Sequence, residues 1–335
     1  MEQRREREFY GFVPMRDDGI LLLDFLASRY SRFDRSGWKD AIEKGKIRVE
    51  GAIITSPLFP LKKHARISYF PGELPEPEAD PTFRVHYEDE FFLVLEKSGN
   101  LCVHPTGPFY KNTLWYQASS LFGELRFVQR LDKETSGLLL AARSREAAAA
   151  VNNGRTLFHK EYLVLVHGDF HGTVHAKGRL VRDERSSVGK KKRFLFADNS
   201  GNTLGESAET ILVRERAVPP GMTLVRALPV TGRQHQIRAT LFSLGFPVAG
   251  DKLYGRDENL FRKISKGGFT EEEKRLLILP RQALHCAVLR FVHPFTGREI
   301  SCSCEADFGG QAGVIPPPPL SDGHRSCTPS ARSLP

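Results

Sequence analysis

The stretch FVQRLDKETSGLLLAARS, residues 127–144, is the most informative part of the chain. An apolar strand runs into a polar turn and leaves it as a second apolar strand, with Gly137 where the backbone bends back. Six polar residues crowd the turn: Arg130, Asp132, Lys133, Glu134, Thr135 and Ser136. Ionisable groups on a loop between buried strands are typical of a functional site. A solvated hairpin turn with local ion pairs has the same pattern, so this stretch alone leaves both readings open.

Strand-like runs recur on both sides of this turn. They are FRVHYED, FFLVLEK, RFVQRL, GLLLAAR, EYLVLVHG, ETILVRER, MTLVRALPV and AVLRFVH. Helices are expected between them at 113–122, 144–153 and 236–245. Because strands and helices are mixed without strict alternation, the sequence predicts an α+β fold. Its central sheet should be mixed and largely antiparallel, with flanking helices.

The composition changes along the chain and predicts five regions. Residues 1–18 are charged and irregular, and we expect an extension there. Residues 19–70 read as two helices, a short hairpin and a strand, which is a small α/β domain. Residues 71–82 carry four prolines and four acids and predict an extended linker. Residues 83–308 form the main domain, and 309–335 cannot bury enough apolar surface to fold, which predicts a disordered tail.

The net charge of +9 and the pI of about 9.3 favour polyanionic partners, nucleic acid first and an anionic membrane surface second. No apolar run is long enough to span a membrane. The charged N-terminus lacks the apolar core of a secretory signal, so a cytoplasmic location is expected.

Cofactor and metal motifs are sparse in this sequence. Neither GxGxxG nor GxxxxGK[ST] occurs, which argues against the common nucleotide cofactors. The five cysteines are scattered, so a disulfide framework is not expected. Cys302 and Cys304 have a spacing that hints at metal, but two small side chains packed on one face of a strand is the favoured interpretation. We therefore expect no metal and no cofactor.

Two further segments combine a buried strand with reactive side chains. HKEYLVLVHG, residues 159–168, places Tyr162 at the start of a strand behind Lys160. LPVTGRQHQIRATLFSLGFPVAGDKLYG, residues 228–255, ends a strand at Thr-Gly-Arg and opens a helix near Arg238. A cation and backbone amides at a helix start suit contact with an anion, although a buried structural arginine has the same pattern.

These segments, taken together, resemble a known family. RLDKETSGLLL is similar to the RLDxxTSGLLL motif of RluA-type pseudouridine synthases, and HKEYLVLVHG to their K-x-Y segment. VTGRQHQIR with GFPVAGDKLYG resembles TGRxHQIR…GxPxxGDxxYG, and LHCAVLRFVHPFTG resembles LHAxxLxFxHPxTG. The match spans about residues 83–308 in the family's order, and the first 70 residues resemble the S-four-like RNA-binding domain that precedes many members. Two positions depart from the family's histidines, Gln129 before Arg-Leu-Asp and Thr240 after the helix arginine.

The resemblance implies an RNA isomerase of the pseudouridine synthase fold that converts uridine in structured rRNA or tRNA to pseudouridine without a cofactor. Asp132 carries over as the catalytic carboxylate, acting either as a nucleophile or as a base on the ribose. Arg238 carries over as the cation that keeps it ionised, since burial alone would raise the pKa of the carboxyl. Tyr162 carries over as the ring beneath the flipped base.

Residues that contact RNA are predicted from the same motifs and from the charge pattern. In the catalytic motifs they are Arg130, Thr135, Lys160, Arg233, His235 and Gln236. In the N-terminal domain they are Arg35, Lys44, Lys46 and Arg48. In RDERSSVGKKKR, residues 182–193, which reads as a mobile basic loop, they are Lys190, Lys191, Lys192 and Arg193. Each basic cluster taken alone could equally be a solvated face.

Two other functions remain as alternatives. One is a non-catalytic RNA-binding or ribosome-assembly protein on the same fold. The other is a hydrolase that uses Asp132 and Glu134 as a carboxylate pair, although their geometry in a turn is not fixed by sequence. We expect a monomer whose partner is RNA, with no membrane and no small-molecule cofactor.

Overall fold

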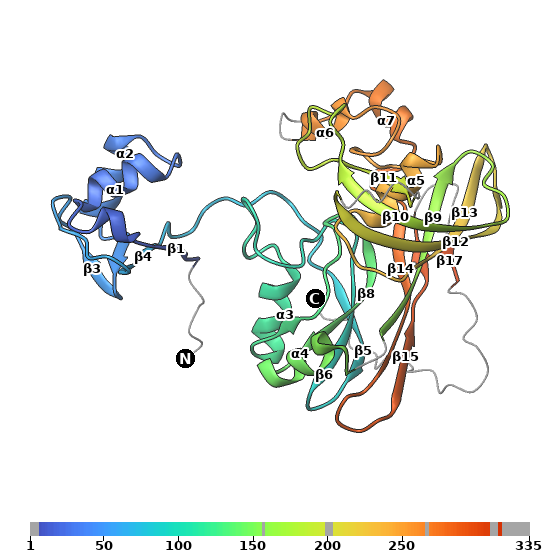
Figure 1. The fold of residues 1–335 in the computed structure, drawn as a ribbon, viewed down its shortest axis with the longest axis horizontal. Helices are drawn as coiled ribbons and strands as arrows, with labels where there is room; N and C mark the ends of the chain where they lie inside the picture. Colours follow the sequence, from blue (N-terminus) through green and yellow to red (C-terminus); the bar gives the residue numbers. More distant parts are fainter. Residues whose placement is uncertain (1–6, 156–157, 198–203, 265–267, 309–313, 317–335) are drawn as a thin grey trace. The chain divides into compact units, whose positions relative to one another are not determined.

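A computed structural model describes residues 7–155, 158–197, 204–264, 268–308 and 314–316. The chain divides into two compact units, Met1–Glu76 and Pro77–Pro335. Figure 1 colours them from blue at the N-terminus to red at the C-terminus. Each unit has its own hydrophobic core, so each is described separately.

The N-terminal unit is a four-stranded antiparallel sheet covered by two helices. The strands lie in the order β1-β4-β2-β3 and are β1 (Phe9–Phe12), β4 (Arg66–Tyr69), β2 (Ile47–Val49) and β3 (Ala52–Ile54). The two helices are α1 (Leu22–Arg29) and α2 (Arg35–Glu43), and the 3-10 turn η1 (Met15–Asp17) precedes them. Asp34 begins α2 by accepting a hydrogen bond from the Gly37 backbone N–H at 2.8 Å.

The prediction that residues 1–18 are an irregular extension is wrong for the part that the structure describes. β1 pairs with β4 in full register, from Phe9 opposite Tyr69 to Phe12 opposite Arg66. In the sequence, the charged neighbours of this segment obscure its alternating aromatic residues. The pairing places β1 beside β4 as the edge strand of the sheet.

The second unit is built on one eleven-stranded sheet. Nine strands follow the order β11-β10-β12-β13-β9-β14-β8-β6-β5, while β15 pairs with β14 and β7 with β8. The bounds are β5 (Phe83–Glu88), β6 (Phe92–Lys97), β7 (Arg126–Phe127), β8 (Ser136–Ala142), β9 (Phe158–His167), β10 (Thr173–Arg182), β11 (Lys192–Phe196), β12 (Glu206–Val218), β13 (Met222–Pro229), β14 (Leu284–Val292) and β15 (Glu299–Ser303). Of these pairs only β8 with β14 is parallel, so the predicted mixed, largely antiparallel α+β sheet is confirmed.

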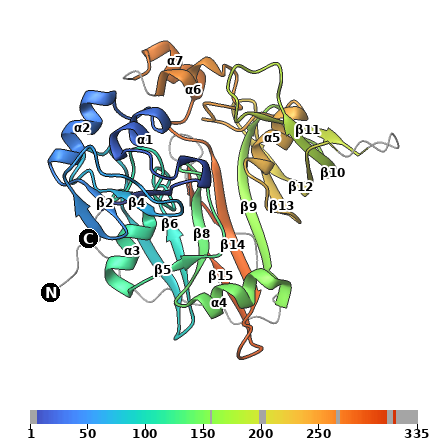
Figure 2. The same cartoon turned by 60° about the vertical axis from the view of Figure 1, so that its left-hand side comes forward.

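Helices lie at both ends of this sheet. Near the β5, β6 and β8 end lie α3 (Leu114–Phe122) and α4 (Arg145–Ala150), which continues as the π-helical turn Val151–Arg155; near β10 and β11 lies α5 (Gln236–Ser243), as Figures 1 and 2 show. The shorter α6 (Asn259–Lys263) and α7 (Glu271–Leu277) follow it. Among the described residues, no helix is both long and apolar enough to cross a membrane.

Two boundaries differ from the sequence prediction. The basic segment 182–193 is not simply a mobile loop, because β10 runs to Arg182 and β11 begins at Lys192, and these two residues face each other across the pair. The stretch from residue 309 is not wholly disordered either. Its described residues include β17 (Val314–Ile315), which pairs with β16 (Ala306–Asp307) and buries Ile315.

The parallel contact between β8 and β14 places the backbones unusually close at Gly137. This residue has φ +104°, and a Cβ there would lie 2.3 Å from the carbonyl oxygen and 2.6 Å from the nitrogen of Cys286. Only glycine fits, because both the backbone angle and the space exclude a side chain. The close approach sets where the polar turn before β8 ends.

We therefore expect Gly137→Ala to destabilise the protein far more than Gly172→Ala. Gly172 also has a positive φ (+63°), but a Cβ there would meet no atom within 4 Å, so its substitution should cost only about 1–2 kcal/mol of backbone strain. Urea unfolding of both variants measures the difference. Equal losses would show that the contact with Cys286 does not constrain the fold.

Candidate active site

The turn between β7 and β8 presents Asp132, and the first turn of α5 presents Arg238. The Arg238 Nη1 donates to the Asp132 Oδ2 at 2.6 Å. The other edge of the guanidinium donates twice to Asp251, from Nε at 2.6 Å and from Nη2 at 2.8 Å. Asp251 in turn accepts the backbone N–H groups of Leu253 and Tyr254, both at 2.9 Å. The geometry is a bidentate pair that leaves one nitrogen of the guanidinium for Asp132.

The electrostatics of this cluster keep Asp132 ionised. Burial pushes the pKa of Asp132 up, but the charge of Arg238, together with His235 and the hydrogen bond from Arg238, holds the pKa below its ordinary value. Burial also acts against the charge of Arg238, yet the two carboxylates raise the pKa of the guanidinium. Arg238 is 7% exposed, whereas the Asp132 side chain is 28% exposed and can be reached from solvent. The partly exposed carboxylate of Asp132 therefore carries a negative charge next to the buried guanidinium of Arg238.

Two aromatic residues complete the surroundings of the pair. His235 precedes α5 in a left-handed conformation (φ 58°), and its Nδ1 lies 3.1 Å from the Tyr254 hydroxyl. That hydroxyl accepts the Lys192 backbone N–H at 2.9 Å, and the Arg238 guanidinium lies 5.0 Å above the Tyr254 ring. Burial lowers the pKa of His235 to about 4, so the imidazole is neutral at physiological pH. We assign its Nε2–H to the side of Asp132, 3.9 Å away.

Tyr162 enters the site from the centre of the sheet. It lies in β9 opposite Ala227 of β13 and Cys286 of β14 and is 7% exposed. Burial raises the pKa of Tyr162, and the neighbouring Cys286 and the charge of Asp132 raise it further, so the phenol is protonated at neutral pH. The charge of Asp132 acts in the same direction as burial on this hydroxyl.

Comparison with known proteins supports one family. A family model described as RNA pseudouridylate synthase matches residues 91–243. The chain is 29% identical over 301 residues to ribosomal large subunit pseudouridine synthase D of Zymomonas mobilis, a match that covers 84% of this chain and 88% of the relative. It is 30% identical over 222 residues to dual-specificity RNA pseudouridine synthase RluA of Vibrio vulnificus, covering 65% and 81%. The chain belongs to the RluA-type RNA pseudouridine synthases.

The fold agrees with that assignment. The solved structure of human RNA pseudouridylate synthase domain containing 1 is similar to this chain with a TM-score of 0.52 and 26% sequence identity, and the match covers 69% of this chain and 86% of that one. The synthase is thus an isomerase with RNA as its partner, and the expected pseudouridine synthase fold is confirmed.

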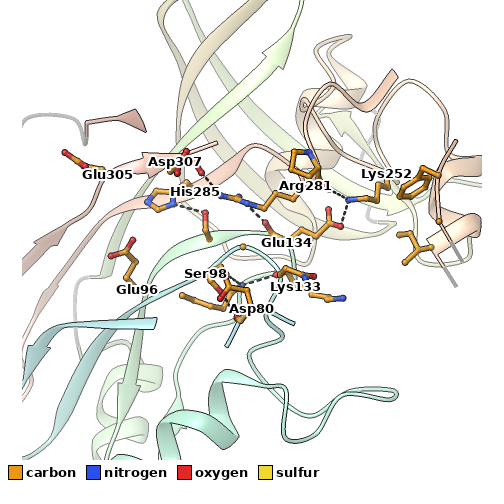
Figure 3. A pocket seen from close by; sticks show the side chains of 18 residues that line it. Asp80, Glu96, Ser98, Lys133, Glu134, Lys252, Arg281, His285, Glu305 and Asp307 are labelled. Carbon is orange, nitrogen blue, oxygen red and sulfur yellow. Dashed lines mark hydrogen bonds and ion pairs between the residues drawn. The ribbon is translucent and has the colours of Figure 1, made fainter. Parts of the chain in front are cut away.

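The polar turn of the synthase is also held by contacts around a cavity that Asp132 does not line. A cavity of about 630 Å³ is lined by Lys133, Glu134 and Ser136 of the turn but not by Asp132. Figure 3 shows Lys252 donating to Glu134, at 2.5 Å, and Arg281 reaching the Glu134 carbonyl oxygen, at 3.5 Å. These contacts fix the turn on the side of the cavity. Glu134 is thus bound by Lys252, whereas Asp132 is bound by Arg238.

Lys97 supports the same turn from the end of β6. Its side chain is fully buried, and its ammonium donates to the carbonyl oxygens of Ser98 at 2.7 Å and Lys133 at 3.0 Å. Burial lowers the pKa of Lys97 to about 7, and the charge of Arg281 adds to that effect. The sequence did not reveal this lysine, because nothing in FFLVLEK separates a buried charge from an ordinary strand end.

Three residues predicted to contact RNA are buried instead. Thr135 is 2% exposed, and its hydroxyl accepts from Gln282 at 2.6 Å. The Gln236 amide is saturated, since its oxygen accepts from Thr231 and from the Arg233 backbone N–H while its nitrogen donates to Glu209 and Thr210. The Lys191 ammonium is buried against Glu258 at 2.8 Å. Their polar groups serve the framework, so the prediction of RNA contacts is wrong for these three.

Four other residues predicted to contact RNA are exposed or half-buried. Arg130 is exposed two residues before Asp132. Lys160 is half-buried near Gly232, where an added Cβ would lie 3.7 Å from its ammonium. Arg233 is exposed and donates to the Ser207 carbonyl oxygen at 3.1 Å. Lys190 is exposed and lies 4.2 Å above the Phe261 ring.

The remaining basic residues have local partners. Lys192 pairs with Glu206, and Arg193 is half-buried in β11 opposite Val181. In the N-terminal unit the pairs are Arg35 with Asp24 at 2.6 Å and Lys44 with Asp40 at 2.8 Å. Lys46 donates to the Pro71 carbonyl oxygen at 3.4 Å, and Arg48 lies 4.1 Å above the Phe70 ring.

The two positions that depart from the family motifs are structural. Gln129 donates to the Leu138 carbonyl oxygen at 3.2 Å and so ties the turn to β8. Thr240 is buried in α5. Cys302 and Cys304 are likewise buried. Among the described residues, no cluster of three or more His, Cys, Asp or Glu side chains could hold a metal ion.

The buried Lys97 makes stability depend on pH in a defined direction. Its pKa is about 7 in the folded protein and about 10.4 when unfolded, so between these values the unfolded chain binds more protons and stability rises with pH. Below pH 7 both states are protonated and the slope vanishes. We expect the unfolding free energy of the wild type, minus that of Lys97→Met, to increase from pH 7 to pH 10 in urea titrations. A difference that does not change with pH would contradict the buried, proton-poor state of Lys97.

Proposed function

We propose that this synthase isomerises uridine in structured ribosomal RNA and that Asp132 is its catalytic carboxylate. The observation that carries the proposal is the partly exposed, ionised Asp132 held by a buried guanidinium beside a buried tyrosine. By its name, one of the relatives above modifies the large ribosomal subunit, which supports ribosomal RNA as the substrate. Transfer RNA, expected from the sequence motifs, is the second candidate substrate.

The reaction breaks the bond between N1 of uracil and C1′ of ribose and joins C5 to C1′. The proton lost from C5 balances the proton gained at N1, so no atom enters or leaves. Asp132 either attacks as a nucleophile or removes a proton from the ribose, and both roles require the ionised carboxylate. Its lowered pKa supplies that state throughout the physiological pH range.

We assign the ring of Tyr162 to the surface beneath the displaced uracil. Because its phenol is protonated, the hydroxyl can pass on a proton but is a poor base by itself. The uracil must leave its stack first, which costs a few kcal/mol and least in a loop. We assign Arg130, which is exposed and precedes Asp132 by two residues, to the space that the base leaves.

The N-terminal unit is proposed to be an S-four-like RNA-binding domain, with Arg35, Lys44, Lys46 and Arg48 near phosphates. Residues 71–82 then act as the linker between it and the catalytic domain. We further propose a monomeric cytoplasmic enzyme without a cofactor. A non-catalytic RNA-binding role is not favoured, because Asp132, Tyr162 and Arg238 gather in one cluster whose charges are balanced for an ionised carboxylate.

Asp132→Asn tests the catalytic assignment. The amide keeps the size of the side chain but removes its charge, so tritium release from RNA labelled at C5 of uridine should fall by at least about a thousandfold. RNA affinity should stay near wild type. The probe is ribosomal RNA from a strain that lacks this enzyme. Substantial turnover by the variant would refute the role of Asp132.

Lys190→Ala tests how the target nucleotide is held. Burial and the positive charge of Arg238 lower the pKa of Lys190, whereas the negative charge of Asp132 raises it. A phosphate arriving at the site would therefore relieve repulsion. The expected result is a higher KM for RNA and a salt slope of log K reduced by about one.

Lys177→Ala is the matched control, because Lys177 is exposed on the same hairpin and pairs with Glu209 at 3.5 Å. A loss confined to kcat, or equal losses in both variants, would remove Lys190 from the phosphate contact.

A further inference from the structure

Among the described residues of the N-terminal unit, α1 and α2 cover one face of the sheet and no helix covers the other. Side chains of successive residues in a strand point to opposite faces. Ile47, Val49, Ile67 and Tyr69 are buried with the residues of α1 and α2. The residues between them in the ladder therefore occupy the other face, which we call the open face. It consists of Tyr10, Phe12, Arg48, Ile53, Arg66 and the buried Ser68, together with Phe70, which follows β4 and lies under Arg48.

The open face exposes large apolar side chains. Tyr10 is 64% exposed, Phe12 57% and Ile53 60%. The rings of Tyr10 and Phe12 belong to one strand and lie 6.1 Å apart at 83°. An antiparallel sheet with one solvated face usually alternates apolar inward and polar outward, so exposed rings here need another explanation. Clustered apolar surface of this kind marks an interaction site.

Two guanidinium groups lie among these rings. The Arg66 guanidinium lies 4.6 Å above the Tyr10 ring, and Arg48 lies 4.1 Å above the Phe70 ring. Glu8 holds Arg66 at 2.9 Å and also accepts from Ser68, so the plane of that guanidinium is fixed. The open face thus alternates aromatic rings with flat cations across β1, β4 and β2.

We propose that the open face is a stacking platform for unpaired nucleotides of the RNA substrate. Rings and guanidinium planes stack on any base, and the arginines are within reach of the phosphates that join stacked bases. Apolar side chains alone would bind a protein partner, and a more strongly basic surface would bind a membrane. The rings and arginines fit RNA, the polymer on which this family acts.

This platform differs from the contacts proposed on the helices. Arg35 and Lys44 belong to α2 and its end, and each already pairs with a carboxylate. The open face instead offers stacking, which tolerates any sequence and does not depend on releasing counterions. The proposal rests on the proposed function only in that the ligand is RNA, and it can be tested without catalysis.

The test is binding of a fluorescein-labelled, single-stranded RNA 12-mer of mixed sequence to the full-length chain. We expect the double substitution Tyr10→Ala with Phe12→Ala to weaken binding at least fivefold, as the loss of one stacked base is worth about 1–3 kcal/mol. The exchange Tyr10→Phe with Phe12→Tyr keeps both rings and should bind within about twofold of wild type. Since stacking is lost rather than charge, the salt slope should not change, whereas Arg48→Ala should lower it by about one.

A second variant guards against misfolding. Tyr10→Leu with Phe12→Leu keeps apolar side chains in an edge strand but removes the rings, and it should bind as weakly as the alanine pair. Unchanged RNA affinity in both folded double variants would overturn the proposal. A change in oligomeric state with unchanged RNA affinity would also overturn it, by assigning the open face to a second copy. Neither result bears on Asp132, whose role is judged by isomerisation.

Discussion

One guanidinium shared between two carboxylates organises the proposed active site. Arg238 is bound on its far edge by Asp251, whose own position is set by two backbone amides of the loop after α5. With that edge bound to Asp251, the Nη1 of Arg238 is directed at Asp132. Two carboxylates and one guanidinium leave one negative charge, and the more exposed carboxylate carries it toward solvent. A buried ion pair contributes little net stability, so its value here is the position and the ionisation that it imposes.

The rest of the second unit holds that arrangement in place. The parallel contact at Gly137 fixes where the polar turn ends, and Lys97 fixes the backbone of the turn through the Lys133 carbonyl oxygen. The Tyr254 hydroxyl joins the loop after α5 to the amide of Lys192 at the start of β11. Elements far apart in the sequence therefore meet at one carboxylate. A substitution that introduces strain or charge at any of these contacts should therefore change the rate of the proposed reaction.

The sequence predicted the sheet, because long apolar runs bounded by turn residues leave little choice of element. The family motifs also singled out Asp132 and Arg238, and the structure joins these two residues in an ion pair. The sequence could not predict that Gln236 and Thr135 turn inward, since a polar residue beside a strand end serves the core or the surface with the same local pattern. Tyr254 was missed for a related reason. Its role depends on a hydrogen bond to Lys192 of β11, which lies in the segment 182–193 that the sequence predicts as a loop.

The most direct test of this account is the ionisation of Asp132 itself. Selective ¹³C labelling of aspartate carboxyl groups, with Asp132 assigned by its absence in an Asp132→Asn sample, would follow its titration in the folded wild-type enzyme. Because Arg238 outweighs burial, the midpoint should lie below the ordinary aspartate value of about 3.9, with no change in signal at neutral pH. A midpoint above about 5 would mean that burial wins and would contradict the central claim.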